Sequence, residues 1–307
     1  MTQSVQPRIL MCRPKHFAVT YTINPWMDPA GWAAADRSLT ASARQEWERL
    51  HHALLGLGAT VELVPPVPDL PDLVFTANAA VVMDRKALLA RFRHPERRRE
   101  QPYFERAFRE LKARGHIDSI VPLPEGVVLE GAGDCVWDGT RRLFWMGHGP
   151  RTTLTAREVV EETFGLETVA LELADPRFYH MDTALSALSK GEVMYFPGAF
   201  TAAGVAEIRA RVAPNLRIEL AEEDACRLAA NAVCIGDAVV LSACSAGLRR
   251  RLAVRGYRVV ATPLSSFLRS GGSAFCLTLR LDRSAEAAGS ARSRRMSSDY
   301  SPAPSAM

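Results

Sequence analysis

The chain has 307 residues, of which 48% are hydrophobic and 23% are charged, and its formal net charge is +4. These values are ordinary for a globular protein that can bury a large core. No apolar run approaches the roughly 20 residues of a membrane-spanning helix, and residues 1–7 lack the pattern of a secretion signal. The arginine excess is concentrated between residues 91 and 109, so we expect no nucleic-acid partner and no membrane partner.

Six cysteines are spread over the chain without any Cys-x-x-Cys pair. A chain of this size does not need a disulfide scaffold, and no spacing is typical of a metal site. We therefore expect a reducing, cytoplasmic setting, no metal and no cofactor. Most of the cysteines should be small buried apolar residues, which leaves one or two for chemistry.

Strand-like and helix-like segments alternate along the chain, which predicts an α/β fold. After a strand at 8–12 comes a long loop rich in Pro, Trp and Asn. Further strands are expected at 60–64, 73–76, 79–83, 87–91, 119–123, 135–137, 142–146, 167–171, 184–189, 192–196, 216–220, 232–235, 238–241, 258–262 and 274–281. Helices are expected at 39–57, around 103–114, from Thr155, at 201–212 and at 246–255. The Thr155 hydroxyl, with Glu158 three residues on, favours a capping box.

The order of two strands, a helix and a strand returns with a period of about 50–60 residues. The clearest echo is Ala77-Asn78-Ala79 against Ala230-Asn231-Ala232. Such a period is typical of units arranged around an axis, as in a propeller, and equally of a three-layer sandwich. Residues 282–307 are rich in Ser, Ala, Arg and Pro, so we expect a disordered tail after a single catalytic domain at 1–281.

One candidate nucleophile follows a pair of glycines, in Arg269-Ser-Gly-Gly-Ser-Ala-Phe-Cys276. Glycines let a ligand approach the main chain closely, and a cysteine at the head of the following strand can point into a cleft. A thiolate is a strong nucleophile once its pKa is lowered. A buried structural cysteine explains the pattern about as well.

Three further stretches carry polar side chains with chemical potential. His180-Met-Asp182 is expected to open a strand, with both side chains on one face, and histidine transfers protons near neutral pH. In Glu130-Gly-Ala-Gly-Asp134 two carboxylates flank a flexible turn, which suits a cation or a histidine and would repel phosphate. In Asp72-Leu-Val-Phe75-Thr-Ala-Asn78 the polar groups interrupt an apolar segment and need partners if buried. Each stretch alone is as readily a surface pair, a charged turn or a structural bridge.

Together these residues are one thiol, one imidazole and several carboxylates. This set suits covalent catalysis on a cationic, electron-poor carbon, because acidic groups would hold the cation while the cysteine attacks it.

In this order the stretches resemble the guanidino-group-modifying superfamily, which includes arginine deiminases, dimethylarginine dimethylaminohydrolases, amidinotransferases and arginine dihydrolases. The resemblance covers about residues 8–281 and implies a five-bladed ββαβ propeller, the pentein fold. It implies Cys276 as nucleophile, His180 as acid and base, Glu130 as the group that orients His180, and Asp182 as a guanidinium clamp. Asp134 corresponds to the aspartate of the family's Glu–Gly–Gly–Asp-like motif, although in this sequence one residue is inserted before it.

The resemblance also implies substrate-binding residues. Arg151, in Pro-Arg-Thr, resembles the arginine that binds the substrate's α-carboxylate, and Arg91 or Arg93 would share that work. A bidentate contact of this kind distinguishes an amino acid from agmatine.

The Phe75-Thr-Ala-Asn78-Ala segment departs from the deiminases, which carry an aspartate in the place of Asn78. This form resembles the arginine and succinylarginine dihydrolases, as does the stretch around Asn24. An ionised aspartate only accepts hydrogen bonds, whereas an amide both donates and accepts, so Asn78 could hold guanidinium first and ureido second. We therefore expect arginine to be hydrolysed twice, giving ornithine, carbon dioxide and two ammonia.

Three other functions stay open at this point. Dimethylarginine could be the substrate, giving citrulline and dimethylamine, and the chain could instead be a non-catalytic propeller that binds a ligand. Amidinotransfer is disfavoured, because the sequence shows no provision for an amine acceptor. The expected partner is a small-molecule substrate, arginine or an N-methylated arginine, and a homo-oligomer is left open.

Overall fold

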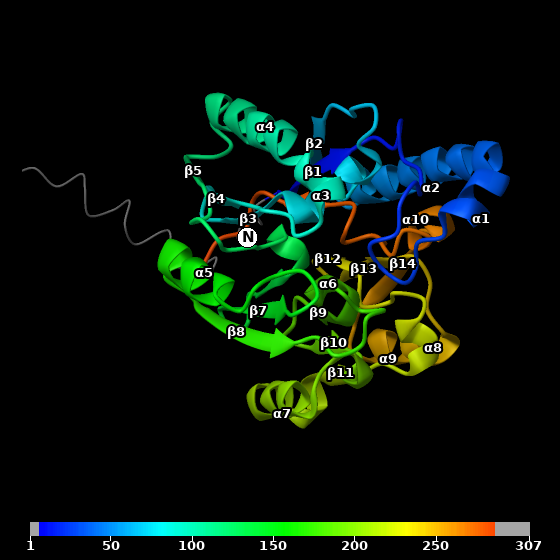
Figure 1. The fold of residues 1–307 in the computed structure, drawn as a ribbon. Coiled ribbons are helices and arrows are strands. Elements are labelled where there is room, and N and C mark those ends of the chain that lie inside the picture. The colour runs from blue at the N-terminus through cyan, green and yellow to red at the C-terminus, as the bar shows by residue number, and fades with distance from the viewer. Residues whose placement is uncertain (1–5, 286–307) are drawn as a thin grey trace, which may run out of the picture.

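The computed structural model describes residues 6–285 and contains five three-stranded sheets arranged around a common axis (Figure 1). The sheets are β15 (Leu279–Arg280), β1 (Arg8–Cys12) and β2 (Thr60–Val64); β3 (Ala80–Met83), β4 (Lys86–Leu89) and β5 (Ser119–Val121); β6 (Cys135–Asp138), β7 (Leu143–His148) and β8 (Glu167–Glu172); β9 (Leu185–Ala187), β10 (Val193–Tyr195) and β11 (Arg217–Glu219); β12 (Val233–Ile235), β13 (Ala238–Leu241) and β14 (Arg258–Ala261). The predicted five-bladed propeller is confirmed.

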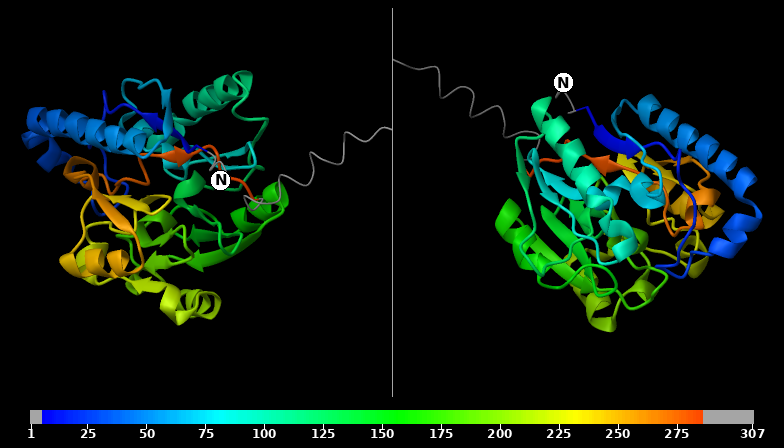
Figure 2. Two further views of the ribbon diagram at one scale, coloured as in Figure 1. Left: turned by 180° about the vertical axis from the view of Figure 1, so that it is seen from behind. Right: turned by 45° about the horizontal axis from the view of Figure 1, so that its top comes forward.

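Each blade repeats one connection. The first two strands pair antiparallel and the last two pair parallel. A parallel pair needs a crossover, and in every blade a helix supplies it on the outside of the ring (Figures 1 and 2). These helices are α2 (Asp36–Gly56), α4 (Gln101–Ala113), α5 (Ala156–Phe164), α7 (Ala202–Arg211) and α9 (Ala246–Val254).

Helix α2 shows why the outer helices pack where they do. Trp47, Leu50 and Leu54 recur at helical spacing and are 0% exposed, forming the stripe that faces the sheets. Two of the short strands, β3 and β13, are buried along their whole length. Burial on both faces explains their continuous apolar runs.

The ring closes through the two ends of the described chain. Strand β15 joins the first blade by pairing antiparallel with β1, with Leu279 opposite Leu10 and Arg280 opposite Ile9. Leu10 and Leu279 belong to one buried cluster beneath helix α4. The residues just before β15 are thereby fixed near the axis.

Some predicted elements are wrong. The apolar segment 73–76 lies in two 3₁₀ helices, Pro71–Val74 and Thr76–Ala79, because full burial hides the period that separates a strand from a helix. Strand 274–281 shrinks to two residues, and 184–189 to β9. The Thr155 hydroxyl contacts Thr153 and does not cap α5.

Five short helices were not predicted: α1 (Pro29–Ala34), α3 (Pro95–Arg98), α6 (Met181–Ala184), α8 (Glu222–Ala225) and α10 (Ser265–Leu268). Within residues 6–285 no helix is long and apolar enough to cross a membrane. Most of the tail predicted at 282–307 lies outside the described residues, so the domain boundary at 281 remains a prediction.

Leu279→Ala should destabilise the fold by about 2–5 kcal/mol, because it opens a cavity where the ring closes. Urea unfolding followed by circular dichroism measures this change. Val254 is 86% exposed, so Val254→Ala is the matched control and should cost less than about 0.5 kcal/mol. Equal stability of the two variants would contradict the importance of the β15–β1 pairing.

Candidate active site

Each blade begins with an irregular turn beside the axis, and these five axial turns (residues 75–79, 129–134, 179–184, 227–232 and 273–278) contain the predicted catalytic residues. Hydrogen bonds join the turns in a closed ring. Its links run from Ala77 N to Cys276 O (3.1 Å), Asn78 Nδ2 to Glu130 O (3.1 Å), Met181 N to Asp134 Oδ1 (3.1 Å), Asn231 Nδ2 to Asp182 O (3.2 Å) and Phe275 N to Asn231 O (3.3 Å). The ring brings side chains from five distant segments to one place.

The Cys276 thiol is buried, with 2% of the residue exposed. It lies in a turn before β15 and not at the head of a strand as predicted. Its sulfur donates to Asp182 Oδ2 at 3.2 Å and accepts from Asn231 Nδ2 at 3.0 Å. Burial raises the pKa of this thiol well above its ordinary value, and the Asp182 carboxylate raises it further. In the free protein the cysteine is therefore a neutral thiol.

Asp182 carries the most distinctive polar atom of the site. Its Oδ1 is buried and has no hydrogen-bond partner among the described residues. Burial raises the pKa of the carboxyl to about 7. An unpaired carboxylate oxygen beside a thiol is a vacant position for a hydrogen-bond donor or a cation.

His180 is held by Glu130, as predicted. His180 Nε2 lies 2.8 Å from Glu130 Oε2, and both side chains are buried. Burial lowers the pKa of His180 to about 4, although the Glu130 carboxylate opposes this shift. His180 precedes helix α6 and does not open a strand. The prediction that His180 and Asp182 lie on one face of a strand is therefore wrong.

Glu130 stays ionised because three donors surround it. Burial alone would raise its pKa, but Arg151 and then His180 lower the pKa well below its ordinary value. Arg151 Nη1 donates to Oε2 at 3.0 Å, and the main-chain N of Arg93 donates to Oε1 at 3.0 Å. A buried ionised glutamate beside a neutral imidazole favours proton uptake by that imidazole.

Asp134 also faces His180, at 3.9 Å from Oδ2 to Nε2. Its oxygens accept from the Thr152 hydroxyl at 2.6 Å and from Met181 N at 3.1 Å. Burial raises the pKa of Asp134 well above its ordinary value. Both oxygens are already bonded, so its main effect is to fix the turn that presents His180.

A small pocket opens onto Cys276. Its lining is Ile23, Asn24, Asp72, Phe75, Asn78, Arg97, Arg151, Tyr179, Ser270, Gly272 and Cys276. Predicted Asn24, Phe75, Asn78 and Arg151 are therefore brought together with the thiol.

The paired glycines serve this cavity through close packing. A Cβ on Gly272 would lie 2.3 Å from the Phe75 ring, so only glycine lets the nucleophile's turn approach that wall. Gly133 plays the same part on the other side, where a Cβ would lie 2.3 Å from Asn78 Nδ2.

Sequence reasoning missed Arg97. Of the arginines between residues 91 and 109, only Arg91 and Arg93 were predicted to bind substrate, yet Arg97 is 3% exposed. It donates to Asn78 Oδ1 at 2.9 Å and to both oxygens of Glu100. The signal available was Pro95, which starts a short helix, together with the spacing of Arg97 three residues before Glu100.

Arg91 does not lie in the cavity. Its guanidinium donates to the main-chain oxygens of Leu123, Pro124 and Val127, so it ties down the 123–127 loop. The alternative, Arg93, donates from its side chain to Gly149 O at 2.8 Å. Arg97 and Arg151 are the two guanidinium groups that line the cavity.

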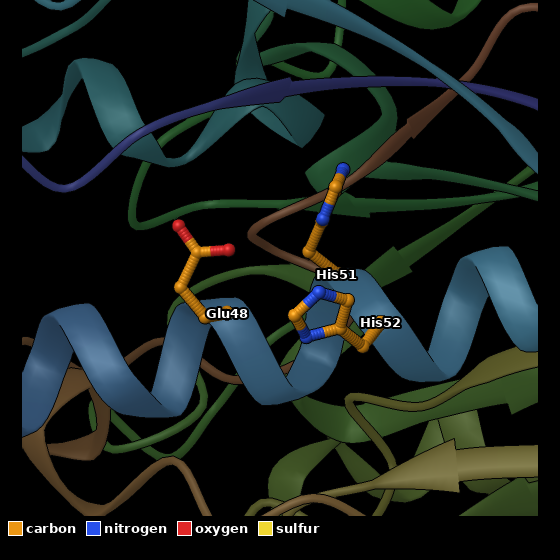
Figure 3. A group of neighbouring side chains, drawn as sticks. All are labelled: Glu48, His51 and His52. Atoms are coloured by element: carbon orange, nitrogen blue, oxygen red, sulfur yellow. The ribbon is translucent and has the colours of Figure 1, made fainter.

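A group on helix α2 could in principle hold a metal ion. Ligand atoms of Glu48, His51 and His52 lie within 4.8 Å of one another (Figure 3). However, Glu48 is already paired with Arg13, and His51 stacks on Trp47 at 5.0 Å. These contacts explain the arrangement without an ion, and none of the three residues lines the cavity.

Known proteins share this fold and much of the sequence. The family described as N,N dimethylarginine dimethylhydrolase, eukaryotic, matches residues 13–283. The bifunctional arginine dihydrolase/ornithine cyclodeaminase ArgZ of Synechocystis sp. is 40% identical over 274 residues, which cover 89% of this chain and 37% of ArgZ. The chain thus spans less than two fifths of the length of ArgZ and of its relative AgrE from Nostoc sp..

A dimethylarginine dimethylaminohydrolase of Mycobacterium tuberculosis is 38% identical over 274 residues, covering 89% of this chain and 85% of that protein. Among solved structures, the N-terminal domain of ArgZ bound to substrate superposes with a TM-score of 0.85 at 38% identity, covering 91% of this chain and 100% of that one. The same domain covalently bound to a reaction intermediate gives 0.86 at 38% identity, with 92% and 100% coverage. The chain therefore belongs to the dimethylarginine dimethylaminohydrolase family, within the guanidino-group-modifying superfamily that its motifs resemble.

Proposed function

We propose that the protein is a cysteine-dependent hydrolase of the guanidino group of L-arginine, and that it is a dihydrolase giving ornithine, carbon dioxide and ammonia. The observation that carries the proposal is the buried Cys276 thiol against Asp182, whose second carboxylate oxygen has no partner in the described part of the chain. A guanidinium group placed there would satisfy that oxygen and present its carbon to the sulfur.

The charges around the cavity favour a cationic ligand. Acidic side chains near Cys276 and His180 are Asp72, Glu130, Asp134 and Asp182, against the two cations Arg97 and Arg151. Removing acidic groups from water is costly unless a cation pairs with them. Arginine supplies that charge at its guanidinium, and its α-carboxylate could bind Arg97 or Arg151 at the other end.

The first half of the reaction follows from the protonation states. Cys276 starts as a thiol because of burial and Asp182, and a bound guanidinium would offset the Asp182 charge and lower the thiol pKa. Once the substrate pairs with Asp182, which faces the thiol at 3.2 Å, we assign neutral His180 as the base that receives the thiol proton, because Glu130 stabilises its cationic form. The sulfur bonds to the guanidinium carbon, the C–N bond breaks, and His180 returns the proton to the leaving ammonia.

In the second half of the reaction, water hydrolyses the S-alkylthiouronium intermediate. His180, neutral again, takes a proton from water, the hydroxide adds to the same carbon, and the C–S bond breaks to give citrulline. In the second round the Cys276 sulfur bonds to the ureido carbon of citrulline, the C–NH₂ bond breaks, and the second ammonia leaves a thiocarbamate. A second water breaks the C–S bond and restores the thiol, and the resulting carbamic acid loses carbon dioxide to give ornithine. The sum is arginine and two water molecules giving ornithine, carbon dioxide and two ammonia.

Asn78 is the residue that we assign to the second round. Its orientation is fixed, because Oδ1 accepts from Arg97 and Nδ2 donates to Glu130 O. An amide remains neutral against the ureido carbonyl of citrulline, where an aspartate would repel it. The relatives ArgZ and AgrE are named arginine dihydrolases, which supports this choice.

Hydrolysis of N-methylated arginine is the second candidate function. It is favoured by the matching family and by the Mycobacterium tuberculosis relative, both named for dimethylarginine. Dimethylamine would then be released in place of the first ammonia. The proposal further includes a small-molecule substrate as partner, with a homo-oligomer left open, and a cytoplasmic setting.

Cys276→Ala should lower arginine turnover by more than about 1,000-fold while the fold is retained, because no covalent bond can form. Ammonia release measures turnover, and circular dichroism checks the fold. Cys244 does not line the cavity, so Cys244→Ala is a matched control that should keep full activity. Substantial turnover by the Cys276 variant would end the covalent proposal.

Incubation with arginine should yield ornithine and two equivalents of ammonia, identified by mass spectrometry. Asn78→Asp should instead accumulate citrulline with one equivalent, because the carboxylate repels the ureido oxygen. Dimethylarginine, agmatine and citrulline serve as parallel substrates. Stoichiometric citrulline from the unaltered protein would rule out the dihydrolase, and preferred release of dimethylamine would support the second candidate.

Activity should fall on the acid side of about pH 7. Burial raises the pKa of Asp182 to about 7, so below that pH the carboxyl is protonated and cannot pair with guanidinium. The pKa of His180 is lowered to about 4, so His180 stays neutral there and does not cause the loss. The kcat/KM for arginine, measured between about pH 5 and pH 9, should drop about tenfold per unit below the midpoint. A flat profile would exclude this role for Asp182.

A further inference from the structure

One of the five axial turns has no part in the reaction described so far. Four turns supply Asn78, Glu130, Cys276 and the pair His180 and Asp182. The remaining turn presents Asn231, which is 0% exposed. It belongs to the sequence echo Ala-Asn-Ala that also contains Asn78.

The Asn231 carboxamide contacts the nucleophile at two points. Its Nδ2 donates to Cys276 Sγ at 3.0 Å, and its Oδ1 accepts from Cys276 N at 3.1 Å. The same Nδ2 also donates to Asp182 O at 3.2 Å. One side chain therefore holds the sulfur, the main chain that carries it, and the turn that carries the carboxylate opposite.

These contacts fix the orientation of the amide. Nδ2 has two hydrogens, and both have acceptors; Oδ1 faces an N–H donor. Turning the amide over would place an oxygen against the Asp182 carbonyl and against the sulfur, and an NH₂ against the Cys276 N–H. Only one orientation satisfies all three contacts.

We propose that Asn231 is a positioning residue that holds the Cys276 thiolate through an N–H···S hydrogen bond once the substrate has bound. The inference rests on the proposed role of Cys276 as nucleophile. A hydrogen bond to an ionised sulfur is stronger than one to a neutral thiol, so the contact stabilises the reactive form.

A neutral donor suits this position better than a cation would. The charged or titratable groups that face the thiol are Asp182, Tyr179 and, across the cavity, Asp72, Arg97 and Arg151. A lysine in place of Asn231 would pair with Asp182 and compete with the guanidinium of the substrate. The amide stabilises the sulfur anion while leaving the Asp182 charge for the ligand.

Two substitutions separate this role from a merely structural one. Asn231→Asp keeps an acceptor for the Cys276 N–H but places an oxygen against the sulfur, and Asn231→Ala removes both contacts. The measured quantity is the alkylation rate of Cys276 by iodoacetamide as a function of pH, followed by mass spectrometry of the peptide that contains it. Asn215 is exposed, and Asn215→Asp is the matched control.

Both Asn231 variants should shift the alkylation midpoint upward by about one to two pH units and lower kcat about 10- to 100-fold, because a hydrogen bond to a charged group is lost. KM should change far less, and Asn215→Asp should change neither quantity. An unshifted midpoint in a folded variant overturns the inference. Should Asn231→Ala not fold, the nearly isosteric Asn231→Asp carries the test.

The alkylation readout needs no substrate, so the two proposals fail separately. A shifted midpoint in a protein that does not hydrolyse arginine would reject the proposed function and keep the role of Asn231. Normal dihydrolase activity with an unshifted midpoint would reject the role of Asn231 and keep the proposed function.

Discussion

A closed ring of hydrogen bonds between the five axial turns is the constraint on which the site depends. Each link joins main-chain, amide or carboxylate groups from neighbouring blades, within 3.1–3.3 Å. Buried polar groups must be paired, so the ring cannot form in part without leaving donors and acceptors unsatisfied. This is how residues as far apart as Asn78 and Cys276 are held at fixed distances with only short strands behind them.

The buried side chains of that ring favour the binding of a positively charged group. Glu130 is paired with Arg151 and His180 and remains ionised, whereas Asp182 has a pKa raised to about 7 and an oxygen without a partner in the described chain. Two buried carboxylates of the axial turns thus have opposite tendencies because their neighbours differ. Glu130 can stabilise an imidazolium at His180, and Asp182 can bind a cation beside the Cys276 thiol.

The grouping of the candidate site residues was easier to predict from the sequence than their local structure. Short motifs and a family resemblance indicate four of these residues, because their residue types suggest the chemistry: Cys276, His180, Glu130 and Asp182. The Glu130 turn was predicted as a turn, but the segments that carry Cys276, His180 and Asp182 were assigned to strands. The segment 73–76 was assigned to a strand as well, because a fully buried apolar segment has no period to separate strand from 3₁₀ helix. The five-blade repeat was legible because the outer helices and central strands recur in order.

Arg97 and Arg91 show where such reasoning stops. Both lie in one arginine-rich segment, and nothing in the residue type tells which guanidinium turns inward. In the structure, Pro95 starts α3, and Arg97 of this helix donates to Asn78 Oδ1. The Arg91 guanidinium instead donates to three carbonyl groups of a loop. Contacts between segments distant in sequence are the information that a single chain does not display.

The pairing of β15 with β1 has a consequence for biosynthesis. A ribosome delivers the first blade's β1 and β2 early, but the strand that completes this blade arrives more than 200 residues later, directly after Cys276. Until then Cys276 has no Asp182 or Asn231 beside it, because the turn before β15 has not docked. The contacts of the Cys276 thiol therefore form in one step, only after β15 has been made, and a chain that stops before β15 carries no preassembled thiol site.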